Sequence, residues 1–263
     1  MQPDLVDSHC HIDVADFDPD RGEVLSRARR AGVRRIVVPA IAADGWDHLE
    51  ATCAGHPGLF PAYGLHPMFL DRHRPGHLDA LADRIARPGV VAVGECGLDH
   101  FVPGLDHAVQ LEFFEAQLRL ARDAGLPVIV HARRAVDEVT AAIRRIGGLR
   151  GVVHSFSGSA QQAQTLWDLG FLVGIGGPVT WPRAQRLRRL VSSMPLEFLL
   201  LETDAPDQPG AGNRGQRNEP GYLPVVLDVV AELRGQDRDD VARATTANAE
   251  RLFGGLALPA PAA

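Results

Sequence analysis

Short apolar runs alternate with longer amphipathic stretches along almost the whole chain. The apolar runs predict strands at residues 5–6, 35–40, 59–67, 90–95, 127–131, 151–154, 171–175 and 197–204. Amphipathic stretches between them predict helices, and the clearest of these places Leu111, Phe114 and Leu118 at helical spacing. Because the strands are continuous apolar runs, we expect a parallel sheet that is covered on both faces.

The number of strand–helix units favours a closed barrel over an open, doubly wound sheet. Eight predicted strands alternate with helices, and the 263 residues are close in number to the roughly 250 of a typical (β/α)8 barrel. No linker or change of composition divides the chain. The sequence therefore predicts the α/β class, as one TIM-like barrel domain over residues 1–263. We expect the small, Pro-rich tail at residues 254–263 to be frayed.

Titratable side chains stand at the ends of the predicted strands. His9 and His11 follow the first strand with one residue between them, so they share one face of an extended chain. Later strands end on four more candidates, which are Glu95, His131, His154 and Asp204. Because a barrel gathers the carboxyl ends of its strands at one mouth, we expect these six side chains to converge there.

This set of donors exceeds the needs of one closed metal site. Structural zinc takes four ligands, whereas the six candidates offer four imidazoles and two carboxylates. They suit two neighbouring divalent ions, each with open positions for water or substrate. The mixed nitrogen and oxygen donors would accept Mg, Mn or Zn. Since the chain has no lysine that could be carboxylated to bridge such ions, Glu95 is the available bridge.

Other polar residues near the mouth offer further contacts. His66 also ends a strand, and we expect it to contact substrate, with a structural role as the alternative. Arg217, in the loop after the eighth strand, is the best candidate for a phosphate contact because a guanidinium fork matches phosphate oxygens, and Asn218 stands beside it. Glu202 is either an acid that supports the metal donors or a core-facing acid with a hydrogen-bond partner.

Composition limits the setting in which the chain works. A formal net charge of -6 argues against a general nucleic-acid-coating surface, yet bound cations can neutralise phosphate locally. The 3 cysteines are scattered and odd in number, which argues against a disulfide framework and favours a reducing compartment. The N-terminus lacks a signal-peptide pattern and no apolar run is long enough to span a bilayer. We expect a cytoplasmic protein without membrane association or an obligate protein partner.

Seven short motifs lie at the predicted strand ends and in the loops after them. They are Asp7–His11, Gly64–Pro67, Gly94–Asp99, Pro127–His131, His154–Gly158, Glu202–Pro206 and Arg217–Pro220. Together they resemble the TatD family of metal-dependent deoxyribonucleases, and the resemblance extends to Phe253. It implies a barrel of the metal-dependent hydrolase type that degrades DNA, commonly single-stranded DNA from its 3′ end and usually with Mg.

The resemblance also implies how the donors divide between two ions. One ion would be held by His9, His11 and Asp204. The other would be held by His131 and His154, with Glu95 shared between them. In the reaction that we hypothesise, Asp204 orients or deprotonates the attacking water, and His66 and Arg217 position the phosphate.

The chain departs from the family pattern at two places. His100 and Phe101 follow Gly-Leu-Asp where the family often has a tyrosine. Trp181, Pro182 and Arg183 stand where the family often has an aromatic residue and a lysine. Both departures concern contacts to nucleic acid, and they leave the metal donors intact.

Two alternatives to a deoxyribonuclease remain open. A small-molecule amidohydrolase or esterase could use the same binuclear centre on an amide or an ester. The missing lysine and the Arg217–Pro220 motif weigh against it. A non-catalytic module that binds metal or nucleic acid would need saturated ions, and the surplus of donors and the acidic net charge weigh against that.

Overall fold

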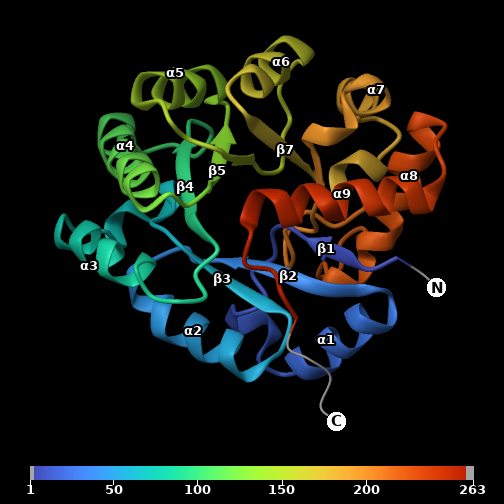
Figure 1. Ribbon diagram of the computed structural model, residues 1–263, viewed down its shortest axis with the longest axis horizontal. Helices are drawn as coiled ribbons and strands as arrows, with labels where there is room; N and C mark the ends of the chain where they lie inside the picture. Colours follow the sequence, from blue (N-terminus) through green and yellow to red (C-terminus); the bar gives the residue numbers. More distant parts are fainter. Residues whose placement is uncertain (1–2, 259–263) are drawn as a thin grey trace.

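Eight parallel strands follow one another in sequence order around a barrel (Figure 1). The computed structural model describes residues 3–258 of the chain. The strands are β1 (Leu5–Asp7), β2 (Val33–Pro39), β3 (Leu59–Tyr63), β4 (Ala92–Asp99), β5 (Val128–Arg133), β6 (Gly151–Val153), β7 (Phe171–Ile175) and β8 (Leu199–Leu201). The N–H of Ser8 donates to the carbonyl of Leu201 at 3.0 Å, which joins the first strand to the last. The predicted eight-stranded α/β barrel is therefore confirmed.

Helices surround the barrel and connect its strands. They are α1 (Arg21–Arg30), α2 (Trp46–Gly55), α3 (Gly76–Ile85), α4 (His107–Ala124), α5 (Val136–Ile146), α6 (Ala160–Asp168), α7 (Gln185–Ser193), α8 (Leu223–Arg234) and α9 (Arg238–Phe253). Short 3-10 helices lie at Ala15–Phe17, Ala43–Gly45, Pro67–Arg72, Gly177–Thr180, Leu196–Phe198, Ala211–Asn213 and Pro220–Tyr222. Within residues 3–258, no helix is both long enough and apolar enough to cross a membrane.

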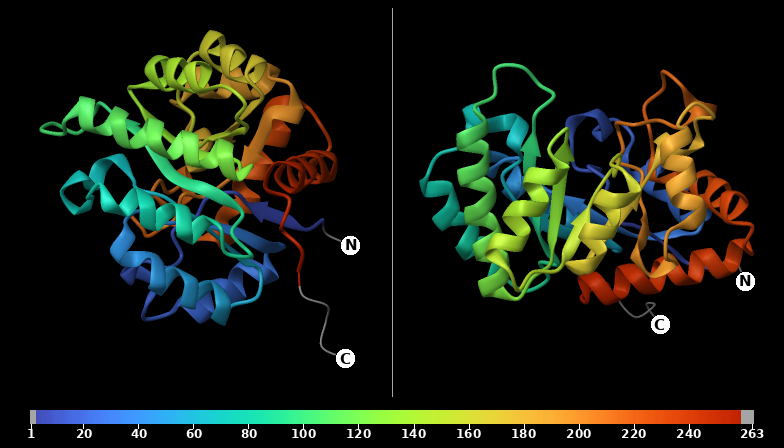
Figure 2. Two further views of the ribbon diagram at one scale, coloured as in Figure 1. Left: turned by 60° about the vertical axis from the view of Figure 1, so that its left-hand side comes forward. Right: turned by 90° about the horizontal axis from the view of Figure 1, so that it is seen from above.

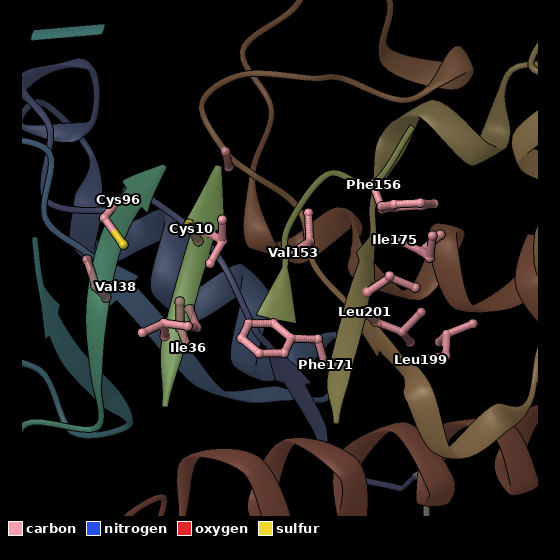
Figure 3. Packing of buried hydrophobic residues seen from close by; sticks show 14 of the residues in the cluster. Cys10, Ile36, Val38, Cys96, Val153, Phe156, Phe171, Ile175, Leu199 and Leu201 are labelled. Carbon is pink, nitrogen blue, oxygen red and sulfur yellow. The ribbon is translucent and has the colours of Figure 1, made fainter. Parts of the chain in front are cut away.

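Apolar side chains of the strands divide between two cores. Successive strand residues face opposite sides of the sheet. One set, which includes Ile36, Val38 and Val153, packs in the larger cluster between strands and helices (Figure 3). The alternate set packs in a second cluster with Leu252 and Phe253 of α9. Its strand members are Val6, Val37, Phe60, Ala62, Ala92, Ile129, Val152, Leu172 and Leu200.

Helix α9 lies across one end of the barrel, and the two views of Figure 2 agree on this placement. Because its apolar residues complete the second cluster, this end of the barrel is filled. The predicted frayed tail begins at Gly254, but Leu256 is 2% exposed and belongs to the same cluster. The chain thus stays packed beyond the end of α9, and residues 259–263 of the predicted tail lie outside the described part.

Several strands differ in length from their predicted ranges, and the differences in β4 and β8 shape the mouth. Strand β4 continues to Asp99 instead of ending at Glu95, so Glu95 lies inside the strand. Strand β8 ends at Leu201, which leaves Glu202 and Asp204 in the turn that follows. The apolar pattern alone could not locate these ends, because the polar residues of β4 are buried as fully as its apolar ones.

Glycine at position 97 allows β4 and β5 to approach each other. Its backbone has φ +145°, and a Cβ placed there would lie 2.0 Å from the carbonyl oxygen of His131. We expect Gly97→Ala to lower the free energy of unfolding by about 3 kcal/mol, since strain and overpacking both oppose it. Urea denaturation measures the change. Gly22→Ala is the matched control because nothing lies within 4 Å of its Cβ position. Equal stability of the two variants would contradict the close packing described here.

Candidate active site

The six predicted metal donors gather at the end of the barrel opposite α9. Five of them line an open cavity of about 810 Å³, and these are His11, Glu95, His131, His154 and Asp204. His9 lies fully buried beside them. The same cavity is lined by His66, the predicted substrate contact. The convergence that the strand ends predicted is therefore present.

A buried carboxylate joins the first and last strands at this mouth. Asp7 accepts hydrogen bonds from the N–H of Thr203 at 2.9 Å and from its hydroxyl at 2.5 Å. The N–H of Asp204 then donates to the carbonyl of His9 at 2.8 Å. Burial raises the pKa of Asp7 to about 7 even though Thr203 opposes the rise. These bonds bring the donors after β1 and β8 to the same place.

One donor cluster has the spacing of a metal site. The Nε2 atoms of His9 and His11 are 3.1 Å apart, and they lie 3.2 and 3.3 Å from Oε2 of Glu95. Oδ1 of Asp204 lies 3.5 and 3.7 Å from the same two nitrogens. In a tetrahedral site with bonds of about 2.1 Å, ligand atoms are about 3.4 Å apart. His9, His11 and Glu95 therefore have the spacing of ligands around one cation, and Asp204 lies next to the two histidines.

A second cluster uses the other oxygen of the same glutamate. Oε1 of Glu95 lies 3.0 Å from Nδ1 of His131 and 2.8 Å from Nε2 of His154. These two nitrogens are 3.3 Å apart. Glu95 is 1% exposed and stands between the clusters, with one oxygen directed at each. This is the geometry of a bridging carboxylate.

Hydrogen bonds on the far side of two rings direct bare nitrogens into the clusters. Nδ1 of His11 faces the carbonyl of Pro39 at 3.0 Å, and Nε2 of His131 faces Oδ2 of Asp99 at 2.9 Å. Because only a protonated ring nitrogen can donate to these oxygens, the opposite nitrogen of each neutral ring carries a lone pair. The facing nitrogens of His9–His11 and of His131–His154 are 3.1 and 3.3 Å apart, a separation that a shared proton or a bound cation can bridge. The donor chemistry thus fits metal binding.

His66 presents the opposite chemistry. Its Nδ1 accepts a hydrogen bond from the N–H of Met68 at 3.1 Å, so the neutral ring carries its proton on Nε2. That Nε2 donates to Oε1 of Glu95 at 2.9 Å. Burial lowers the pKa of His66 to about 4, which keeps the ring neutral. His66 is therefore a hydrogen-bond donor at the cavity wall rather than a further metal ligand.

The pKa shifts of the donors indicate that both clusters attract positive charge. Burial alone would raise the pKa of Glu95, but His66, His154 and His9 hold it well below its usual value. Burial opposes protonation of His11 and His154 as well, yet Glu95 raises the pKa of His11 to about 9 and that of His154 to about 10. Positive charge next to the buried carboxylate is favourable in both clusters.

Two supporting acids stand behind the donors, and only one was considered from the sequence. Asp99 is fully buried, and besides His131 it receives the N–H groups of Phe101 at 2.8 Å and Val102 at 3.0 Å. Sequence reasoning gave Asp99 no role, although it stands four residues after Glu95 in one strand. Glu202 accepts the N–H of Ser155 at 2.5 Å and lies 3.8 Å from Nδ1 of His154. Of the two alternatives for Glu202, the geometry favours support of the donors.

Gln208 is a further mouth residue that sequence reasoning missed. Its side-chain amide donates to Oδ2 of Asp204 at 2.5 Å and its carbonyl accepts from the hydroxyl of Ser155 at 2.8 Å. It also lines the cavity. No periodic pattern marks a glutamine in an irregular loop, so only the folded loop reveals this contact.

Arg217 and Asn218 take other partners than the predicted phosphate. The guanidinium of Arg217 pairs with Asp20 at 2.7 Å and with Glu219 at 3.4 Å, and it does not line the cavity. Asn218 is 2% exposed and donates to the carbonyl of Thr203 at 2.8 Å. These contacts fasten the loop after β8, and the predicted contact of both residues with phosphate stays a prediction.

Removal of the Asp99 charge tests the orientation of His131. We expect Asp99→Asn to weaken binding of one Zn²⁺ or Mn²⁺ by about 10–100-fold, because an outer partner of a ligating histidine sets its tautomer and orientation. Isothermal titration of the metal-free chain measures this affinity. Asp123→Asn, at an exposed position of α4, is the matched control. An unchanged affinity in the Asp99 variant would show that this contact does not prepare the site.

Comparison with known proteins agrees with this geometry. A family profile described as TatD related DNase matches residues 6–254. The uncharacterized metal-dependent hydrolase YjjV of Escherichia coli K12 is 41% identical over 252 residues, covering 95% of this chain and 97% of that protein. The crystal structure of this TatD homolog matches with a TM-score of 0.92 at 40% identity, over 95% of this chain and 98% of that one.

A second relative carries a more specific name. The 3′-5′ ssDNA/RNA exonuclease TatD of Klebsiella pneumoniae is 34% identical over 261 residues, covering 95% of this chain and 98% of that protein. The family match, the relatives and the donor clusters agree with one another. The chain belongs to the TatD-related DNase family and is a metal-dependent hydrolase on an eight-stranded parallel α/β barrel.

Proposed function

We propose that this chain hydrolyses phosphodiester bonds of nucleic acid, with two divalent ions as cofactors. The observation that carries the proposal is the buried Glu95, whose two oxygens face two donor clusters at the wall of an open cavity. His9, His11 and Asp204 would hold one ion and His131 and His154 the other, with Glu95 between them. Mg, Mn and Zn all suit these mixed donors.

The protein side of the reaction follows from the positions of three residues. Bound divalent ions would supply positive charge to the phosphate and acidity to a water molecule. Asp204, 8% exposed at the cavity, orients or deprotonates that water, and Gln208 fixes its second oxygen. His66 directs its N–H from the opposite wall toward the same region and can donate to a phosphate oxygen. Arg217, the predicted phosphate contact, pairs with Asp20, so a contact with phosphate would require it to exchange that partner.

Substrate class rests on the family and on one relative. The family description names DNase activity, and the K. pneumoniae relative acts from 3′ to 5′ on single-stranded DNA or RNA by its name. We therefore propose single-stranded DNA ends as the substrate, with RNA as a possible second polymer. All three cysteines are free, which fits the predicted cytoplasmic setting.

A cleavage assay tests the proposal directly. The chain is incubated with end-labelled single- and double-stranded DNA and RNA in Mg²⁺, Mn²⁺ or Zn²⁺. We expect ladders that shorten from the 3′ end of single strands, and no cleavage in excess chelator. Glu95→Gln and Asp204→Asn should each lower the rate by about a thousandfold, because both remove charge from the donor clusters. Glu112→Gln, exposed on α4, is the matched control.

The same assay separates the alternatives. A parallel panel of amides and carboxylic esters reveals a small-molecule amidohydrolase or esterase. Turnover of an amide without any turnover of phosphodiesters would contradict the proposed function. Wild-type rates on DNA in the Glu95 variant would contradict the assigned roles.

A further inference from the structure

An exposed aromatic ring at the mouth is flanked by two guanidinium groups. The Cζ atom of Arg133 lies 3.7 Å from the ring centroid of Phe101, and that of Arg134 lies 4.6 Å from it. Phe101 is 44% exposed, which is unusual for a large apolar side chain. We call Phe101, Arg133 and Arg134 the arginine rim. Cation–π contacts of this kind hold guanidinium groups in place while their N–H groups stay accessible.

The arginine rim stands where two cavities meet. Arg133 lines the central cavity, and Arg134 lines a neighbouring cavity of about 410 Å³. Ala132 and Ser157 line both, so the two cavities adjoin. A polymeric substrate bound at the donor clusters could therefore extend past the rim into the second cavity.

The two guanidinium groups at this junction are open to an anion, although Asp137 and Glu138 line the second cavity together with Arg186. Arg133 has Asp99 as its nearest acid, at 4.0 Å, and Asp99 is already paired with His131. Among the described residues, no carboxylate pairs with Arg134. The acids of the second cavity have other partners: Asp137 accepts from Gln162 at 2.8 Å, and Glu138 faces His100 at 3.6 Å.

The rim is also fixed relative to the donor clusters. Asp99 accepts the N–H of Phe101 with one oxygen and faces His131 with the other. Arg133 ends β5, the strand that carries His131, and Arg134 follows it with φ 57°, in the left-handed region. Non-glycine residues in this region are uncommon and cluster at ligand-binding positions. A single carboxylate thus holds a metal donor and the rim at a set separation.

We propose that the arginine rim binds a phosphate of the substrate strand next to the scissile one, with Phe101 as a positioning residue for the two guanidinium groups. The strand then passes from the central cavity into the second cavity. This inference rests on the proposed function and adds to it a preference for polymers over small phosphate esters. Unlike Arg217, Arg133 lines the central cavity itself.

Salt dependence of binding tests the rim. Affinity of a fluorescent single-stranded DNA 10-mer is measured by anisotropy with Ca²⁺ present, between 50 and 200 mM NaCl. Log affinity falls as log salt rises, and each phosphate contact makes this slope more negative by about 0.7 for single strands. Because both guanidinium groups contact one phosphate, we expect the double variant Arg133→Gln/Arg134→Gln to reduce the magnitude of that slope by about 0.7, and each single variant to reduce it by part of that amount. Arg144→Gln, an exposed arginine in the last turn of α5, removes the same charge and should leave the slope unchanged.

Kinetics provide the second readout. In Mn²⁺, Arg134→Gln should raise KM for the 10-mer several-fold with little change in kcat, and should affect bis(p-nitrophenyl) phosphate less. Phe101→Leu should also raise KM, because it removes the ring that holds the guanidinium groups. Phe101→Tyr keeps the ring and should leave KM at the value of the unaltered chain. If the chain cleaves DNA but the salt-dependence slopes of the Arg133 and Arg134 variants equal that of Arg144→Gln, the rim proposal is overturned and the proposed function stands. No binding or cleavage of any phosphodiester by the unaltered chain overturns the proposed function and the rim together.

Discussion

The carboxylate of Glu95, buried among imidazoles, is the interaction on which the site depends. A carboxylate that is 1% exposed loses its hydration, and only charged or hydrogen-bonding partners can offset that loss. Its partners come from the ends of several strands, with each oxygen directed at a separate group. The imidazoles complement it, since ring nitrogens about 3 Å apart can share a proton or a cation between them. Bound cations satisfy both sides at once.

The barrel tolerates this concentration of buried polar groups because its two ends have separate roles. Apolar strand residues and α9 fill one end, and this packing supplies the stability of the fold. The other end can then hold donors whose arrangement serves function rather than packing. Three acids stand behind the donors, namely Asp7, Asp99 and Glu202. Each accepts a hydrogen bond from a backbone N–H group of a nearby loop, and these bonds hold the donors in place. The donors are therefore positioned before any ion or substrate arrives.

The sequence predicted those features that follow from periodicity and from barrel topology. Apolar runs located every strand, and the barrel rule brought His9 and Asp204 together from opposite ends of the chain. The sequence could not predict hydrogen bonds between side chains or the conformation of irregular loops. Gln208 and Asp99 carry no periodic signal, and the ion pair between Arg217 and Asp20 joins residues that only the folded loop brings together. Charge and loop position therefore marked Arg217 as a candidate, but they could not show the carboxylates with which it pairs.

Anomalous diffraction from Mn²⁺-loaded crystals tests the central claim most directly, because it counts the ions and locates them relative to Glu95. The account predicts two peaks about 3.5–4 Å apart, one beside each oxygen of this carboxylate. A single peak, or peaks that lie away from Glu95, would contradict it.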